Sequence, residues 1–366
     1  MERGRARDFG VAIGNLPTGA RNAITDVDGV RVGHSTLIRD HAPDGGGTVR
    51  TGVTAVFPHE GLPWEERVYA GTHVLNGYGE MIGTNQIAEW GLLHSPIVMT
   101  SSLAIGRAYD ATIRWRTDRH ATTTHDGGDM PVVTECDDSF LNDVTGFPLA
   151  DEDVYAALDA AVSGDVGEGC VGAGTGMQCM DFKGGIGTAS RVIEPGFTVG
   201  ALVLTNFGDR ENLRIDGVPV GAQITDLMPE EHSEGSCICV IATDAPMLPH
   251  QVRRLAVRAG LGLARTGSTA HNGSGELMIA FSTANRIPLE TRDGTLEVRA
   301  LLDGSASDRP AAFSALFLAT IEAIEEAVVN ALFTATTTVG RGGNVLHALP
   351  IDRTLEILSR YGRSPL

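Results

Sequence analysis

The stretch Gly235-Ser236-Cys237-Ile238-Cys239-Val240-Ile241-Ala242-Thr243 places a serine, preceded by glycine, at the start of an apolar run. Its length and its β-branched residues predict a buried strand that follows the polar loop 229–234. If the bond between Gly235 and Ser236 breaks, Ser236 carries a free α-amine beside its own hydroxyl, so that base and nucleophile share one residue. An α-amine has a pKa of roughly 7.7–8.0 and can accept the hydroxyl proton near neutral pH. The alternative, more frequent for an isolated Gly-Ser pair, is an intact turn into a strand.

The composition narrows the class of protein. The chain has 366 residues, of which 42% are hydrophobic, and a formal net charge of −18. Nucleic acids and anionic membranes bind basic surfaces, so neither is an expected partner. An acidic surface suits amine-bearing ligands, although it can serve solubility alone. The N-terminus lacks an apolar stretch of signal length, and no run approaches the roughly 18 apolar residues of a membrane span, so a cytoplasmic location is expected.

The cysteines and histidines give no metal or disulfide pattern. Cys237 and Cys239 lie two apart, on one face of the predicted strand, which is poor disulfide geometry, and the five cysteines are expected to be reduced. There is no Cys-x-x-Cys and no His-Glu-x-x-His motif. His120 and His125 lie in a threonine-rich loop, where solvent exposure is a more frequent role than metal binding. We therefore expect neither a metal nor a cofactor.

Predicted strands and helices alternate along the chain. Apolar runs predict strands over 53–58, 96–100, 198–205 and 277–282, and helices over 154–162, 249–265 and 311–333. A further helix is expected to begin at Ser101–Ser102 with serine as its cap, and Glu322, Glu325 and Glu326 are expected to form an acidic patch. The mixture favours a layered α/β sandwich in one domain spanning residues 1–366.

A glycine-rich stretch covers residues 172–177 and 183–191. It suggests a phosphate cradle, but it matches neither a Walker motif nor a Gly-x-Gly-x-x-Gly turn between a strand and a helix. Close packing of the backbone beside a site is the favoured interpretation.

Four polar residues lie next to predicted strands. Ser274 and Glu276 are two apart, so in extended backbone they face one side, where a hydroxyl backed by a carboxylate can orient protons. Asn206 ends an apolar strand, where its amide can donate to a developing oxyanion. Glu135 also follows a strand-like run and can hold a substrate ammonium group. Taken singly, each also fits an ordinary polar turn, strand cap or surface acid.

Taken together, several motifs are similar to those of one known family. They are Asn22–His34, Gly172–Arg191, Asn206-Phe207-Gly208, Val240–Pro246 with Pro249–Gln251, Ser274-Gly275-Glu276 and Gly340–Asn344. With Gly235-Ser236 they resemble, nearly from end to end, the self-processing β-peptidyl aminopeptidase and L-aminopeptidase/D-esterase family of N-terminal-nucleophile hydrolases.

The resemblance implies a role for each candidate residue. Ser236 is the nucleophile, freed by cleavage after Gly235 into an α subunit of residues 1–235 and a β subunit of residues 236–366. Ser274 and Glu276 assist it, and Asn206 lines the oxyanion hole.

Glu135 occupies the position at which the family binds the substrate's α-amine. The family often supplies an oxyanion tyrosine two residues later, where this chain has Asp137. The second oxyanion donor and the choice among L-, D- and β-aminoacyl substrates are therefore left open.

The implied fold is a four-layer α-β-β-α sandwich, usually in a homotetramer of α/β heterodimers. The implied activity is cofactor-free hydrolysis of N-terminal aminoacyl amide, peptide or ester bonds. Two alternatives remain at this point: a related self-cleaving amidase for ω-amino or synthetic oligoamides, and an uncleaved, non-enzymatic binding scaffold.

Overall fold

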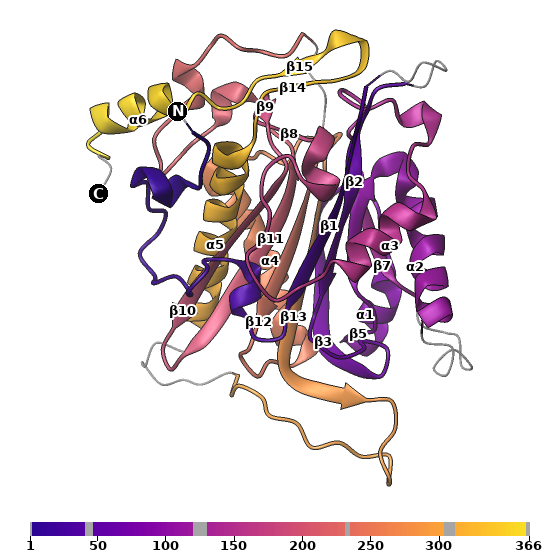
Figure 1. Cartoon of the computed structure of the whole chain (residues 1–366). Coiled ribbons are helices and arrows are strands. Elements are labelled where there is room, and N and C mark those ends of the chain that lie inside the picture. The colour runs from indigo at the N-terminus through magenta and orange to yellow at the C-terminus, as the bar shows by residue number, and fades with distance from the viewer. Residues whose placement is uncertain (1, 41–46, 120–129, 231–234, 304–311, 364–366) are drawn as a thin grey trace.

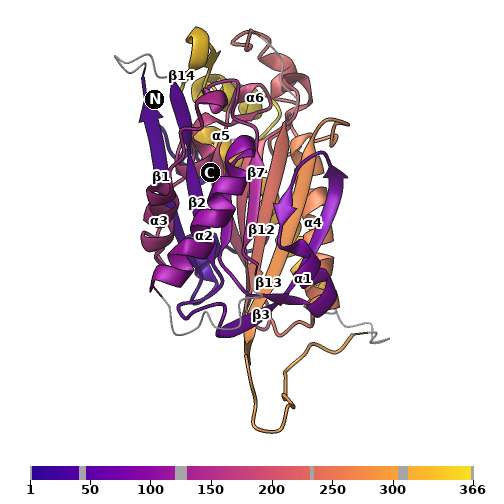
Figure 2. The same cartoon turned by 90° about the vertical axis from the view of Figure 1, so that its right-hand side faces the viewer.

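Two β-sheets stack at the centre of the molecule, with helices on their outer faces (Figures 1 and 2). The computed structural model describes residues 2–40, 47–119, 130–230, 235–303 and 312–363. Within these ranges, one sheet has five strands in the order β1-β2-β6-β7-β4, and the other has six in the order β10-β11-β12-β13-β3-β5. The strands of the first sheet are β1 (Arg31–Arg39), β2 (Val49–Phe57), β6 (Ile97–Ser101), β7 (Val132–Cys136) and β4 (Met81–Ile82). Those of the second are β10 (Ile186–Ile193), β11 (Phe197–Asn206), β12 (Ser236–Thr243), β13 (Gly275–Pro288), β3 (Glu66–Gly77) and β5 (Leu92–Leu93).

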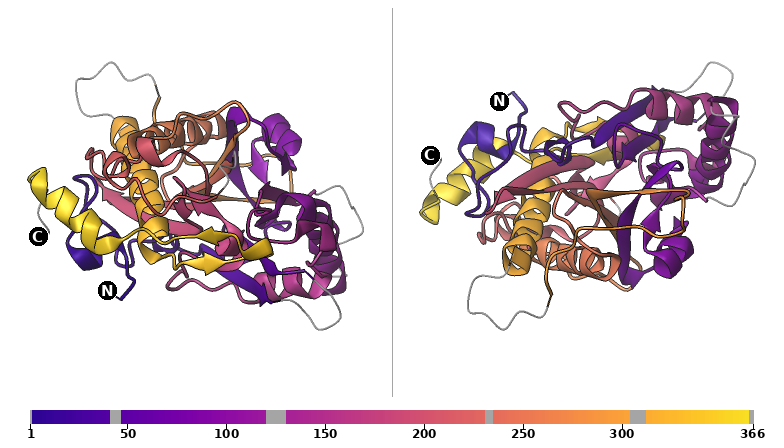
Figure 3. Two further views of the ribbon diagram at one scale, coloured as in Figure 1. Left: turned by 90° about the horizontal axis from the view of Figure 1, so that it is seen from above. Right: turned by 90° about the horizontal axis from the view of Figure 1, so that it is seen from below.

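Helices complete the four layers, as Figure 3 shows from above and below. The helix α5 (Ala312–Thr334) packs on β10 and β11, and α4 (Pro249–Thr266) packs on β3 and β13. On the other outer face, α2 (Ile105–Arg119) and α3 (Asp151–Asp159) cover the five-stranded sheet. The remaining elements named in Figure 1 are α1 (Thr84–Trp90), α6 (Ile351–Arg360), β8 (Gln178–Cys179), β9 (Phe182–Lys183), β14 (Thr338–Val339) and β15 (Val345–Leu346).

Three hydrophobic cores separate the layers. Ile238 and Val240 lie in the core between the two sheets, whereas Cys237 and Cys239 lie in the core between β12 and the helices α4 and α5. This alternation is the period of two that a strand imposes, and because both faces are covered the strand is apolar throughout. A third core, which includes Trp115, lies between the five-stranded sheet and α2 and α3. The predicted α-β-β-α sandwich is confirmed.

The pairing of β12 positions the start of this strand. It runs antiparallel to β11 and parallel to β13. The end of β11 and the beginning of β13 therefore meet at the edge where β12 begins. The three predicted strand segments that carry Asn206, Ser236 and Ser274–Glu276 thus converge on one edge of the six-stranded sheet.

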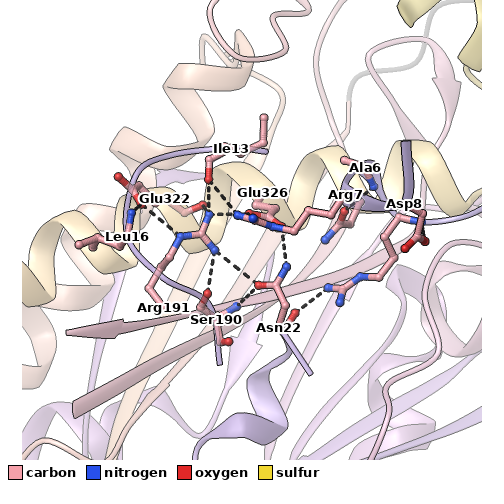
Figure 4. Close-up of polar contacts among 12 residues, drawn as sticks. Ala6, Arg7, Asp8, Ile13, Leu16, Asn22, Ser190, Arg191, Glu322 and Glu326 are labelled. Atoms are coloured by element: carbon pink, nitrogen blue, oxygen red, sulfur yellow. Dashed lines mark hydrogen bonds and ion pairs between the residues drawn. The ribbon is translucent and has the colours of Figure 1, made fainter. Parts of the chain in front are cut away.

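The predicted acidic patch on α5 is wrong, because its glutamates are buried. Arg191 of β10, itself fully buried, pairs with Glu326 at 2.5 Å and with Glu322 at 3.1 Å, and Arg7 pairs with Glu326 at 2.6 Å (Figure 4). Burial acts to raise the pKa of Glu326, but the hydrogen bond from Arg7 and the charge of Arg191 outweigh it, so this pKa lies below its ordinary value. Glu325 pairs with Arg265 at 3.1 Å.

The glycine-rich stretch packs backbone against backbone, as expected. Gly185 has φ +141°, and a Cβ added there would lie 1.9 Å from the carbonyl oxygen of Gly169. At Gly176, an added Cβ would lie 2.2 Å from the carbonyl oxygen of Arg50. The buried Lys183 donates to three carbonyl groups of this stretch, including that of Met177 at 2.8 Å.

Several other predictions can be compared with the structure. All five cysteines are free thiols. No helix within the described ranges is long and apolar enough to cross a membrane. His120 and His125 lie outside the described residues. The expected serine cap is wrong, because Ser102 begins a 3₁₀ turn ahead of α2 and its hydroxyl donates to Glu135 instead.

Candidate active site

Ser236 is the first residue of β12 and lies between two other strands. It pairs with Asn206 across the antiparallel β11, and the N–H of Gly275 donates to Ser236 Oγ at 3.1 Å. The side chain is largely buried, with 7% of the residue exposed. Because the following seven residues are all buried between neighbouring strands, the position of the hydroxyl is fixed by the sheet itself.

Gly235 lies against the backbone of Asn206. A Cβ added to Gly235 would be 1.7 Å from the carbonyl oxygen of Asn206 and 3.1 Å from Nδ2 of the same residue. The Asn206 amide is held on both sides: Oδ1 accepts from the N–H of Gln178 at 3.0 Å, and Nδ2 donates to the carbonyl of Asp137 at 2.8 Å. Since Nδ2 carries two hydrogens, one stays available beside the Gly235–Ser236 peptide.

Ser274 and Glu276 form a buried hydrogen-bonded pair at the start of β13. The Ser274 hydroxyl donates to Glu276 Oε1, whereas Glu276 Oε2 is buried without a hydrogen-bond partner among the described residues. Burial raises the pKa of Glu276 despite the hydrogen bond from Ser274. Both residues and Gly235 line a cavity of about 10 Å³, which is room for roughly one water-sized group. The predicted common orientation of Ser274 and Glu276 is confirmed.

Glu135 shares a second, larger cavity with Ser236. This cavity has a volume of about 420 Å³, and both residues line it. Glu135 Oε1 accepts from the N–H of Glu80 at 2.9 Å, and Oε2 accepts from the Ser102 hydroxyl. Burial is the main cause that raises the pKa of Glu135, and the charges of Asp137 and Glu80 act in the same direction.

Asp137, which stands where the family often has an oxyanion tyrosine, also lines the larger cavity. Its side chain is exposed and accepts from the N–H and the hydroxyl of Ser139 at 2.9 and 2.8 Å. A carboxylate has no proton to donate to an oxyanion at neutral pH. Asp137 therefore does not replace that tyrosine as a donor, whereas the side-chain amide of Asn206 is a hydrogen-bond donor beside the Gly235–Ser236 peptide.

The structure brings together every residue that the sequence singled out for catalysis. Ser236 lines the large cavity together with Glu135, and its neighbour Gly235 lines the small cavity together with Ser274 and Glu276. Such a site can attack an acyl carbon whose amine-bearing end lies against a buried carboxylate. No group of three or more potential metal-ligating side chains occurs in the part of the chain that the structure describes.

The sequence analysis missed several residues of the site. Ser102 and Glu80 contact Glu135, and Gln178 orients Asn206. Glu80 and Ser102 belong to none of the sequence motifs, because the fold brings them in from other strands and turns. Gln178 lies within Gly172–Arg191, but its contact with Asn206 is made by its backbone N–H, which the residue type does not reveal. The pair Ser101–Ser102 predicts only the start of a helix.

Comparisons with known proteins agree with this geometry. The model of Peptidase family S58 matches residues 22–346. The chain is 41% identical over 379 aligned positions to the β-peptidyl aminopeptidase BapA of Sphingosinicella microcystinivorans, which covers 98% of this chain and 93% of that protein.

Solved structures are similar over the same length. A β-aminopeptidase from a Burkholderia species superposes with a TM-score of 0.90 at 42% identity, covering 98% of this chain and 99% of that one. The L-aminopeptidase D-Ala-esterase/amidase of Ochrobactrum anthropi superposes with a TM-score of 0.91 at 44% identity, covering 98% of this chain and 99% of that one. It is a serine aminopeptidase described as a variant of the N-terminal-nucleophile hydrolase fold. These matches favour the hydrolase over the non-enzymatic scaffold. The chain belongs to peptidase family S58 and is a serine aminopeptidase with an N-terminal-nucleophile hydrolase fold.

Proposed function

We propose that the protein cleaves itself between Gly235 and Ser236 and then uses Ser236 to remove N-terminal residues from small peptides, aminoacyl amides and esters. The observation that carries this proposal is the position of Ser236 at the start of β12. There it lines the cavity of Glu135, and its hydroxyl accepts from the N–H of Gly275, between Ser274 and Glu276 in the chain.

Maturation begins when Ser236 Oγ attacks the carbonyl carbon of Gly235. The free hydrogen of Asn206 Nδ2 stabilises the oxyanion, the C–N bond of the peptide breaks, and an ester links Gly235 to the Ser236 oxygen. The α-amine of Ser236 leaves with a proton. Water then hydrolyses the ester, which yields the Gly235 carboxylate and restores the Ser236 hydroxyl.

Turnover uses the amine that maturation frees. The neutral α-amine of Ser236 accepts the proton of its own hydroxyl as Oγ attacks the substrate's acyl carbon. Glu276, which lines the small cavity with Gly235, orients that amine through its buried Oε2, which has no other hydrogen-bond partner among the described residues. Asn206 stabilises the tetrahedral oxyanion, the leaving amine or alcohol departs with the proton, and water hydrolyses the acyl-enzyme. Removing one oxyanion donor typically costs about 10²–10³ in kcat.

Glu135 binds the free α-ammonium group of the substrate. Its carboxylate is fixed by Glu80 and Ser102 within the cavity that Ser236 also lines. This contact makes the enzyme an aminopeptidase rather than an endopeptidase, because a blocked amine cannot form it. The similarity to β-peptidyl aminopeptidases extends the proposed range to N-terminal β-residues.

The two fragments remain one folded catalytic domain after cleavage. The β12 strand stays paired with β11 of the other fragment, and Arg191 stays paired with Glu322 and Glu326. We place the protein in the cytoplasm, in keeping with its five free cysteines, and expect a tetramer of α/β heterodimers. We expect no bound metal, cofactor, nucleic acid or membrane.

The remaining alternative has the same chemistry with another substrate. A self-cleaving amidase for ω-amino or synthetic oligoamides would also use Ser236, and the 420 Å³ cavity has room for an extended acyl chain. A panel of α-, β- and ω-aminoacyl p-nitroanilides distinguishes the two, because an ω-amidase turns over the ω-amino substrates fastest.

One experiment tests the nucleophile and the cleavage together. Purified wild-type protein should run as two associated fragments on a denaturing gel, and intact mass should place the break between Gly235 and Ser236. The Ser236→Ala variant should remain a single chain of 38.5 kDa without aminopeptidase activity. A wild-type protein that stays intact yet hydrolyses aminoacyl amides would overturn the mechanism.

A further inference from the structure

The cavity beside Ser236 carries more negative charge than one substrate amine neutralises. Three carboxylates line it, those of Glu80, Glu135 and Asp137, and no lysine, arginine or histidine is among its described lining residues. Aminopeptidase chemistry accounts for one of them, Glu135, which holds the α-ammonium group. Glu80 and Asp137 have no role in that step.

Both additional carboxylates are exposed and fixed by local hydrogen bonds. Glu80 Oε1 accepts from the N–H of Met81 at 2.9 Å, and both oxygens of Asp137 accept from Ser139. Neither forms an ion pair among the described contacts, so no cationic side chain of the described residues competes with a ligand for them. Their effect reaches Glu135, because both charges contribute to raising its pKa.

The rest of the lining suits an aliphatic stem. Three lining positions are glycines and leave space: Gly77, Gly79 and Gly273. Ile105 and the largely exposed Tyr78 supply apolar surface beside them. A long side chain with an ammonium end buries its methylene groups against such surface and keeps its charged end in water, where the exposed carboxylates lie.

We propose that Glu80 and Asp137 select N-terminal residues with a cationic side chain, so that the preferred substrates are lysyl-like amides, peptides or esters with two positive charges. This inference rests on the proposed aminopeptidase function and names its substrate class. Glu135 binds the α-ammonium group, while Glu80 and Asp137 attract the side-chain ammonium group. Exposed ion pairs of this kind are worth about a two- to fivefold preference each.

The test compares lysyl and norleucyl p-nitroanilide, which share the α-amine and the four-carbon stem and differ in the terminal charge. The measured quantity is the ratio of the two kcat/KM values. Wild-type enzyme should prefer the lysyl substrate by about 4- to 25-fold. Glu80→Gln and Asp137→Asn should each lower that ratio about two- to fivefold. The double variant should have a ratio close to one. Glu297→Gln, in the exposed segment beyond the far end of β13, is the matched control and should keep the wild-type ratio.

Salt gives a second measurement that requires no variant. The Debye length falls from about 10 Å at 0.1 M salt to about 3 Å at 1 M, so the wild-type preference for the lysyl substrate should shrink as salt is added. A wild-type ratio near one, a ratio that the double variant keeps, or a ratio independent of salt would each overturn the inference. If the wild-type enzyme turns over neither substrate, the same comparison is made with β-homolysyl and β-homonorleucyl p-nitroanilide. If it hydrolyses none of the four, or if Ser236→Ala hydrolyses the same substrates as the wild type, the proposed function fails instead.

Discussion

Replacing Gly235 by alanine should slow self-cleavage by about two orders of magnitude. The added Cβ would lie 1.7 Å from the carbonyl oxygen of Asn206 and 2.6 Å from its carbonyl carbon. These are backbone atoms at the end of β11, where Asn206 is paired with Ser236 of β12, so they cannot rotate away as a side chain can. The Gly235–Ser236 peptide must instead move by about 1 Å or more, and a misplacement of that size can cost about 10²-fold in rate.

The assay follows conversion of the precursor during cell-free synthesis, with samples denatured at intervals and the fragments separated on a gel. Gly164→Ala is the matched control, because an added Cβ at Gly164 meets no heavy atom within 4 Å and should leave the half-time unchanged. Circular dichroism should show that the Gly235→Ala precursor retains the wild-type fold. A Gly235→Ala precursor that matures with the wild-type half-time would show that the close approach to Asn206 does not position the scissile bond.

Four further outcomes follow from the site and the buried ion pairs. Glu135→Gln should lower kcat/KM for aminoacyl amides with a free amine by about 10–150-fold, because a charge-assisted contact is worth about 1.5–3 kcal/mol. The variant should still cleave itself. If the wild-type enzyme hydrolyses N-acetylated substrates as fast as free ones, Glu135 does not bind the substrate amine. Because the pKa of Glu135 is raised, its charge is lost at a higher pH than that of an ordinary carboxyl group, so KM for the free amine should rise as pH falls through that range and should not do so in Glu135→Gln. Activity should survive prolonged incubation with EDTA, and a loss that zinc or manganese restores would refute the mechanism. Glu326→Gln should lower the free energy of unfolding by about 3–5 kcal/mol in urea titrations, because Arg191 stays buried without its full charge partner, whereas exposed Glu297→Gln should change it by no more than about 0.5 kcal/mol.

Local sequence patterns were sufficient for the elements that carry the nucleophile. The predicted helix over 249–265 corresponds to Pro249–Thr266, and the strand over 198–205 corresponds to Phe197–Asn206. The spacing of Ser274 and Glu276 predicted their common orientation, because an extended backbone repeats every two residues. These features depend on periods of a few residues, which a single sequence displays.

The features that the sequence could not predict depend on contacts between residues that are far apart in the chain. Glu322 and Glu326 look like surface acids on a helix, but Arg191 comes from a strand more than 130 residues earlier in the chain. Likewise, Glu80 reaches the cavity of Glu135 from a separate turn 55 residues away. Burial of a charge and the shape of a cavity depend on such distant neighbours, and no local period encodes them.

The central position of β12 also determines how the two newly made chain ends would behave. Ends of chains usually fray, because few contacts hold their last residues. Ser236 would instead begin a strand whose eight residues are all buried and paired with β11, and the seven residues after Ser236 are also paired with β13. Its amine would therefore be immobilised without any further ordering step, and the conformational entropy of placing it would already have been lost when the precursor folded. A synthetic two-fragment enzyme should accordingly be active only when it is refolded with both fragments present, because the sheet that immobilises Ser236 draws its neighbouring strands from each of them.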